Sequence, residues 1–126
     1  LQIHSIVTRS HKRHPMRQIE SQMIAAIESD TNWTKNNTSV ISEDGISSVY
    51  LHGNLIAEVD DESIKLYDGG HQSKTTKSRL NAILSRFGYS TEECVFQKNY
   101  EWFLNMFDSS NGTMRIIPFT SGMRLA

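Results

Sequence analysis

The fold of this chain is decided by the sequence SVISEDGISSVYLHGNLIAEVDDESIKLY, which spans residues 39–67. Apolar and polar residues alternate in four short runs, and pairs of residues with strong turn preferences separate these runs. The pairs are Asp44-Gly45, Gly53-Asn54 and Asp60-Asp61. Because a two-residue turn joins antiparallel neighbours, the stretch predicts a four-stranded antiparallel meander. We expect its strands at residues 39–43, 46–52, 55–59 and 63–67.

The alternation also predicts which side chains of the meander face the core, because side chains of a strand point to opposite faces in turn. The predicted buried set is Val49, Leu51, Leu55, Ala57, Val59, Ile64 and Leu66. The predicted outward set is Ser48, Tyr50, Glu58, Lys65 and Tyr67.

Helical spacing of apolar residues flanks the meander on both sides. Residues 17–30 predict an N-terminal helix, and a second helix follows Asp68-Gly69-Gly70 and ends at Gly88. Residues 94–97, 100–106 and 114–119 then predict two to three further strands, with a helical turn as the alternative for 100–106. The last of these strands is expected at an edge because it contains Pro118. The fold class is therefore α+β, with a mostly antiparallel sheet and both helices packed on one face.

Length and composition favour one domain. A chain of 126 residues buries roughly two-thirds of its unfolded surface, which is enough for a single core. Thirteen basic and fourteen acidic residues nearly cancel, so any binding to a polyanion must be local. The single cysteine, Cys94, excludes an internal disulfide and a cysteine-based zinc site. No apolar run approaches the roughly 18 residues of a membrane span, and we expect a soluble protein.

Residues 1–15 differ from the rest of the chain. They contain no methionine and end in the basic run HKRHP, directly before Met16. We expect either upstream sequence that is foreign to the natural protein, or a disordered basic leader that touches a polyanion. Residues 16–126 are expected to form the single α+β domain.

The start of the second helix has unusual charges. The first turn of a helix normally attracts acidic residues, because its backbone N–H groups and the helix dipole are positive there. Here it collects cations and hydroxyls, and we expect the cations to point outward from the apolar stripe of the helix. Either they pair with the acidic residues of 58–68, or they form an anion site. The candidate ligands for a phosphate or a nucleic acid are Ser73, Lys74, Thr75, Thr76, Lys77 and Arg79.

Two alternatives to phosphate binding stay open. A protein-interaction module that modulates a host factor, or that forms a homo-oligomer, could use the outward side chains of the meander or an open edge strand. The residues of this possible partner surface are Tyr50, Lys65, Tyr67, His52 and His71. An enzyme could use one of the two histidines together with an aspartate. The sequence contains no recognised catalytic or metal-binding motif, and no cofactor is predicted.

Aromatic residues cluster between residues 96 and 107. They could be a stacking platform for single-stranded nucleic acid, but core packing is the stronger interpretation. Only Tyr100 or Trp102, if exposed, would support stacking. The cluster consists of Phe96, Tyr100, Trp102, Phe103 and Phe107, with Lys98 between them.

Several separated motifs resemble a family of short proteins from tailed phages and marine metagenomes. The motifs are NTSV at 37–40, VYLHGNLIA at 49–57, DGG at 68–70, TTKSRLN at 75–81 and VFQKNYEW at 95–102. The likeness covers the chain from Met16 onward, although His71 stands where that family leads us to expect an aromatic residue. The resemblance implies a phage gene product that works in the bacterial cytoplasm, and it implies no activity, cofactor or catalytic residue.

Overall fold

The computed structural model describes residues 16–125, so the expected leader at residues 1–15 lies outside the described part. Within that part the chain forms two helices, α1 (Gln18–Glu28) and α2 (Lys74–Phe87), and nine strands. The strands are β1 (Trp33–Lys35), β2 (Thr38–Glu43), β3 (Ile46–Leu51), β4 (Asn54–Val59), β5 (Ile64–Leu66), β6 (Cys94–Lys98), β7 (Glu101–Asp108), β8 (Thr113–Pro118) and β9 (Met123–Leu125).

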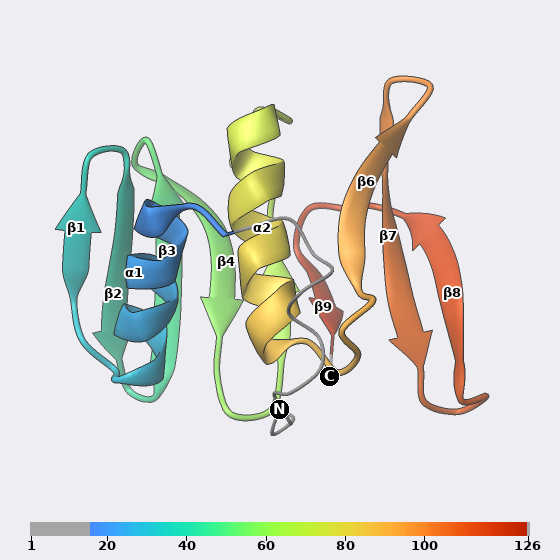
Figure 1. Ribbon diagram of the computed structural model, residues 1–126, viewed down its shortest axis with the longest axis horizontal. Coiled ribbons are helices and arrows are strands. Elements are labelled where there is room, and N and C mark those ends of the chain that lie inside the picture. The colour runs from blue at the N-terminus through green and yellow to red at the C-terminus, as the bar shows by residue number, and fades with distance from the viewer. Residues whose placement is uncertain (1–15, 126) are drawn as a thin grey trace.

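The strands form two antiparallel sheets. The large sheet has the order β1-β2-β3-β4-β5-β9, and both helices lie on one of its faces (Figure 1). The predicted α+β class and the meander β2 to β5 are thus confirmed. Two strands were not predicted: β1, which pairs with β2, and β9, which returns from the end of the chain to pair with β5.

One prediction of burial within the meander was wrong. Val49 pairs with Ala57 but Tyr50 pairs with Leu55, so Ile56 is an extra residue in β4. This β-bulge turns Ile56 into the core, where it is 1% exposed, and leaves Leu55 half-buried. Strict alternation fails at a bulge because two residues oppose one on the partner strand.

The main core lies between the large sheet and the two helices. Met23 and Ile27 come from α1, and α2 contributes the predicted stripe of buried side chains. This stripe consists of Leu80, Ile83, Leu84 and Phe87. Gly88 follows α2 at the predicted C-cap position, where its N–H donates to the Leu84 carbonyl at 2.9 Å. The apolar spacing of each helix therefore determines which of its faces is buried.

The small sheet has the order β6-β7-β8 and packs beside α2 (Figure 1). The side chain of Asn81 on α2 accepts from the Val95 N–H at 2.7 Å and donates to the Val95 carbonyl at 3.0 Å. These two bonds attach the outer edge of β6 to the helix. Val95, Trp102 and Leu104 point from the small sheet into the core.

Candidate interaction surface

Arg79 lies inside the protein, so the prediction that it points outward was wrong. Its side chain forms an ion pair with Glu20 of α1 at 2.7 Å, and both side chains are 4% exposed. Further guanidinium N–H groups donate to Thr38 Oγ1 at 3.0 Å and to Asn37 Oδ1 at 3.3 Å. Ser78 Oγ also donates to Glu20, at 2.6 Å. Arg79 is therefore part of a buried hydrogen-bond network that joins both helices to β2.

A sequence signal for this network existed. Glu20 lies three residues before Met23 and four before Ile24, so it occupies the apolar stripe of its own helix. Arg79 likewise precedes Ile83 by four residues. A charged residue on a buried stripe requires a partner of opposite sign, because an isolated buried charge is very costly. This reasoning could have predicted from the sequence that Glu20 and Arg79 pair with each other.

The other candidates at the start of α2 divide into two groups. Ser73 caps the helix by accepting from the Thr76 N–H at 3.1 Å, and Thr76 is itself buried. Lys74 is exposed, while Thr75 and Lys77 are half-buried. Within residues 16–125 neither lysine forms an ion pair. The structure thus brings two cations and the cap together at the surface.

The acidic segment upstream does not neutralise these lysines. Asp60 accepts from the N–H groups of Glu62 and Ser63 at 2.8 and 2.7 Å, which lowers the pKa of its carboxyl. Asp68 accepts from the Gly70 N–H at 2.8 Å. Both carboxylates therefore stabilise turns of their own segment.

The predicted partner surface on the meander lies on the uncovered face of the large sheet. Lys65 is exposed there, and Tyr50 and Tyr67 are half-buried. The Tyr67 hydroxyl donates to Glu58 at 2.7 Å, and this hydrogen bond raises the pKa of Tyr67 above its usual value. The face also carries Ile41 and Ile46, which are 45% and 39% exposed, among its polar and charged side chains.

His52 and His71 are both exposed, each in a connection between elements. In the part of the chain that the structure describes, no three His, Cys, Asp or Glu residues gather in a way that could hold a metal ion. His52 lies in the turn between β3 and β4, and its backbone N–H donates to the Asn37 carbonyl at 2.8 Å.

The aromatic cluster is divided between the two faces of the small sheet. Trp102 is 4% exposed and packs edge-to-face on Phe119, so it cannot stack on a ligand. The alternate residues point the other way, onto a face that we call the outer face. Its residues are Cys94, Phe96, Lys98, Glu101, Phe103, Asn105, Phe107, Met114, Ile116 and Pro118.

Two aromatic stacks dominate the outer face. Phe96 stacks on Phe103 across the β6–β7 pair with ring centroids 5.7 Å apart. Tyr89, which is 52% exposed, stacks on Phe107 at 5.1 Å. Ile116 is 61% exposed, and the three phenylalanines are only half-buried. Core packing, which we favoured for the whole cluster, therefore holds for Trp102 but is wrong for these three rings.

The turn between β6 and β7 holds a strained tyrosine. Asn99 and Tyr100 have φ values of 52° and 67°, the left-handed pair of a type I′ turn. The turns between β2 and β3 and between β3 and β4 place Gly45 and Gly53 at the second position, each at φ 79°. A side chain there costs roughly 1 kcal/mol. Tyr100 is nevertheless 93% exposed, so burial of its ring does not offset this cost.

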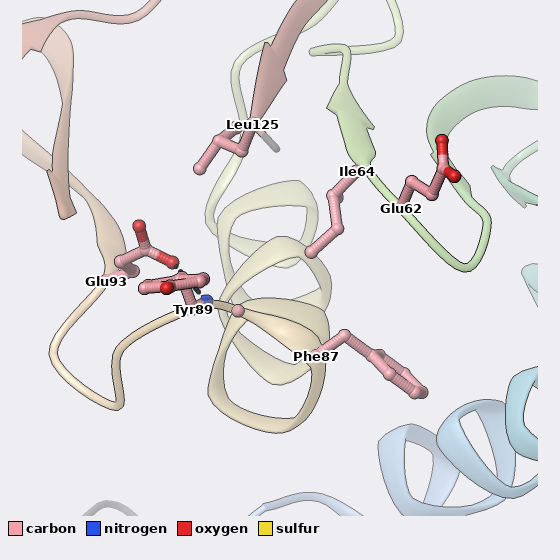
Figure 2. Close-up of a pocket in the computed structure, with 7 residues that line it drawn as sticks. Glu62, Ile64, Phe87, Tyr89, Glu93 and Leu125 are labelled. Carbon is pink, nitrogen blue, oxygen red and sulfur yellow. Dashed lines mark hydrogen bonds between the residues drawn. The ribbon is translucent and has the colours of Figure 1, made fainter. Parts of the chain in front are cut away.

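A small pocket lies at the C-terminal end of α2, beside β5 and β9 of the large sheet (Figure 2). Its free volume of about 20 Å³ holds roughly one water molecule. Glu93 borders it, and its carboxylate accepts from the N–H groups of Tyr89 and Phe107 at 2.8 Å each. The pocket is too small for a substrate, and its buried acid positions the backbone behind the outer face. The lining residues are Glu62, Ile64, Phe87, Gly88, Tyr89, Glu93 and Leu125.

Strand β8 is an open edge of the small sheet, as Pro118 predicted. The Phe119 N–H donates to the Trp102 carbonyl at 3.0 Å. Since bonded pairs alternate along an antiparallel ladder, the backbone groups of Met114 and Ile116 point away from β7. The edge therefore exposes the backbone hydrogen-bonding groups of Met114 and Ile116, whereas Pro118 has no N–H to donate.

Comparison with known proteins adds the family. Among the described residues, no helix has the length and apolar character needed to cross a membrane. No curated protein and no solved structure matches the chain. A protein-family model, described as Kyanoviridae Gp96 protein, matches residues 16–126. This match supports the phage-related origin that the sequence motifs implied, and the chain belongs to the Kyanoviridae Gp96 protein family.

Proposed function

We propose that this phage protein is a non-enzymatic binding module that acts through a protein–protein contact made by the outer face of the small sheet. The observation that carries the proposal is the group of exposed and half-exposed apolar side chains on that face, among which Ile116 is 61% exposed, together with Tyr89, which stacks on Phe107 and is 52% exposed. Exposed apolar patches of this kind mark interaction sites, and aromatic residues are enriched at the centres of interfaces.

The charges of the outer face favour a protein over a nucleic acid. Its charged side chains are one cation, Lys98, and one anion, Glu101, which cancel. Single-stranded nucleic acids bind where aromatic rings lie in a positively charged groove, because the phosphates require neutralisation. A neutral face of phenylalanine, isoleucine and methionine fits the apolar surface of another polypeptide.

Site-specific photo-crosslinking in infected host cells tests this proposal. A photoreactive residue replaces Ile116 on the outer face, and in a matched control it replaces Ile41, which is 45% exposed on the large sheet. We expect a discrete protein adduct from position 116 and none from position 41. Phe103→Asp in the position-116 protein should abolish the adduct. Equal adducts at both positions, or none at either, would contradict the proposal.

Phosphate or nucleic-acid binding at the start of α2 is the second candidate, and one observation favours it. Lys74 and Lys77 have no acidic partner within residues 16–125, although carboxylates are abundant in the preceding segment. The site is smaller than the sequence suggested, because Arg79 and Thr76 are buried. Two lysines and the first turn of one helix predict weak binding with a shallow salt dependence.

Fluorescence anisotropy with labelled single-stranded DNA and RNA across a salt series tests the second candidate. Binding that weakens linearly in log salt and disappears in Lys74→Glu/Lys77→Glu supports it. The matched control is Lys65→Glu, which reverses an exposed cation on the large sheet. Absence of binding at low salt removes this candidate and leaves the outer face as the functional surface.

A further inference from the structure

We infer that the partner of the outer face is a second copy of this chain, packed face to face as a weak homodimer. The inference rests on the proposed function and names its partner. It comes from the order of side chains along β6 and β7, which makes the outer face complementary to itself.

Cross-strand neighbours on the outer face are matched in chemistry. Lys98 pairs with Glu101, and one step further along the same face Phe96 pairs with Phe103. A two-fold axis that runs along the strands between β6 and β7 exchanges the two strands. Each residue then meets the copy of its own cross-strand neighbour.

Such an axis therefore brings Lys98 of each copy over Glu101 of the other, and Phe96 over Phe103. No like charges meet, and two oppositely charged contacts form at the rim of an aromatic centre. An isologous interface requires this kind of self-complementarity, because one patch must serve both partners. An apolar centre inside a polar rim is also the usual organisation of a specific interface.

The alternative of joining two copies along their β8 edges is less compatible with the structure. Two-fold antiparallel pairing centred on Arg115 places the two arginines directly opposite each other, which is unfavourable. Pairing centred on Ile116 reaches Pro118, which has no N–H to donate. Contact through the faces avoids both problems.

The small size of the face limits the strength of the contact. About this axis β6 and β7 of one copy lie over β7 and β6 of the other, while β8 of each copy lies beyond β6 of the other and borders the contact. Two strands spaced about 4.8 Å apart and about six residues long give a flat area of roughly 200 Å². Two facing copies bury on the order of 400 to 700 Å² in total, below the 1,200 Å² where standard interfaces begin. The dimer should therefore be weak, and its population should depend on protein concentration.

Sedimentation velocity of the full chain between 10 μM and 1 mM tests the inference. We expect the mean mass to rise from monomer towards dimer over this range. Phe103→Asp should weaken dimerisation at least about a hundredfold. A wild-type protein that stays monomeric at 1 mM overturns the inference.

A charge-swap series tests the register and identifies self-association. Lys98→Glu alone and Glu101→Lys alone should each weaken dimerisation about tenfold, because each places like charges across the interface. The double variant Lys98→Glu/Glu101→Lys should restore it. Each single variant also places like charges opposite each other within its own β6–β7 hairpin. Thermal unfolding of every variant therefore checks that the hairpin remains folded. A folded double variant that fails to regain dimerisation overturns the proposed packing.

The outcomes separate this inference from the proposed function. If the wild type stays monomeric while position 116 still crosslinks to a different protein, the second copy is wrong and the binding surface stands. If position 116 gives no adduct and the chain stays monomeric, both fail. An adduct between two copies of the chain supports both.

Discussion

The guanidinium of Arg79 lies 2.7 Å from the carboxylate of Glu20, and this ion pair joins the two helices through residues that are 59 positions apart in sequence. Thr38 and Asn37 accept further N–H groups of the same guanidinium. The pair therefore also holds both helices on β2. Since the charge is neutralised inside the protein, the basic start of α2 needs no ligand to account for Arg79.

Removing the cation of this pair should be strongly destabilising. We expect Arg79→Met to lower the free energy of unfolding by about 3 to 5 kcal/mol, because Glu20 remains buried without its partner. Glu20→Met/Arg79→Met should cost clearly less than the sum of the single changes. Urea denaturation of the four proteins measures the coupling.

A matched control exists on the same helix. Arg86 pairs with Glu28 at the surface, where the two side chains are 48% and 37% exposed. We expect Arg86→Met to change the free energy of unfolding by at most about 1 kcal/mol. Equal losses for Arg79→Met and Arg86→Met would show that burial of the first pair has no energetic consequence.

Relief of the strained turn should stabilise the protein. Tyr100→Gly removes a side chain from a residue at φ 67° and should raise the free energy of unfolding by about 1 kcal/mol. The reciprocal change is Gly53→Ala, in open space at φ 79°, which should lower it by about as much. Thermal denaturation measures both. A destabilised Tyr100→Gly would mean that the ring contributes to the fold after all.

The Asn81 amide should be necessary for attachment of the small sheet. Asn81→Leu leaves the N–H and the carbonyl of Val95 without partners and should cost about 2 to 3 kcal/mol. Hydrogen exchange at the Val95 amide should accelerate with it. Asn105→Ala is the control, since this amide donates to the Glu92 carbonyl at the surface. Unchanged exchange at Val95 would show that β6 is held by other contacts.

Asp60 should make stability depend on pH at the acidic end. Its folded pKa is lowered by hydrogen bonds from the N–H groups of Glu62 and Ser63. The stabilisation is therefore present above the usual carboxyl pKa of about 4, and it is lost as pH falls through the lower folded value. The difference in urea midpoint between wild type and Asp60→Ala should be largest at pH 6 and should shrink as the pH falls below the usual carboxyl pKa.

Asp60→Asn separates charge from hydrogen bonding in this turn. The amide oxygen can still accept, but the side chain no longer titrates, so the acid-dependent part of the difference should disappear. If wild type and Asp60→Asn lose stability in parallel between pH 6 and pH 2, Asp60 is not responsible for the dependence.

Much of the architecture was predictable because its signals are local. Turn pairs such as Asp44-Gly45 and the alternation around them predicted the meander, and Pro118 predicted the edge at β8. The bulge at Ile56 was not predicted, because a shift of register has no marker in the residue pattern. β9 was missed because three residues carry too little pattern to identify a strand.

The sequence by itself determined the fold class, the two helices and the order of most strands, since propensity, periodicity and turn chemistry act over a few residues. Only the tertiary structure decided which charged and aromatic side chains are available. Arg79 is buried because it pairs with Glu20, which comes from the other helix. Phe96 and Phe103 were left on an outer face because Trp102 and Leu104 fill the opposite one. Such outcomes depend on long-range partners, and local sequence patterns do not specify those partners.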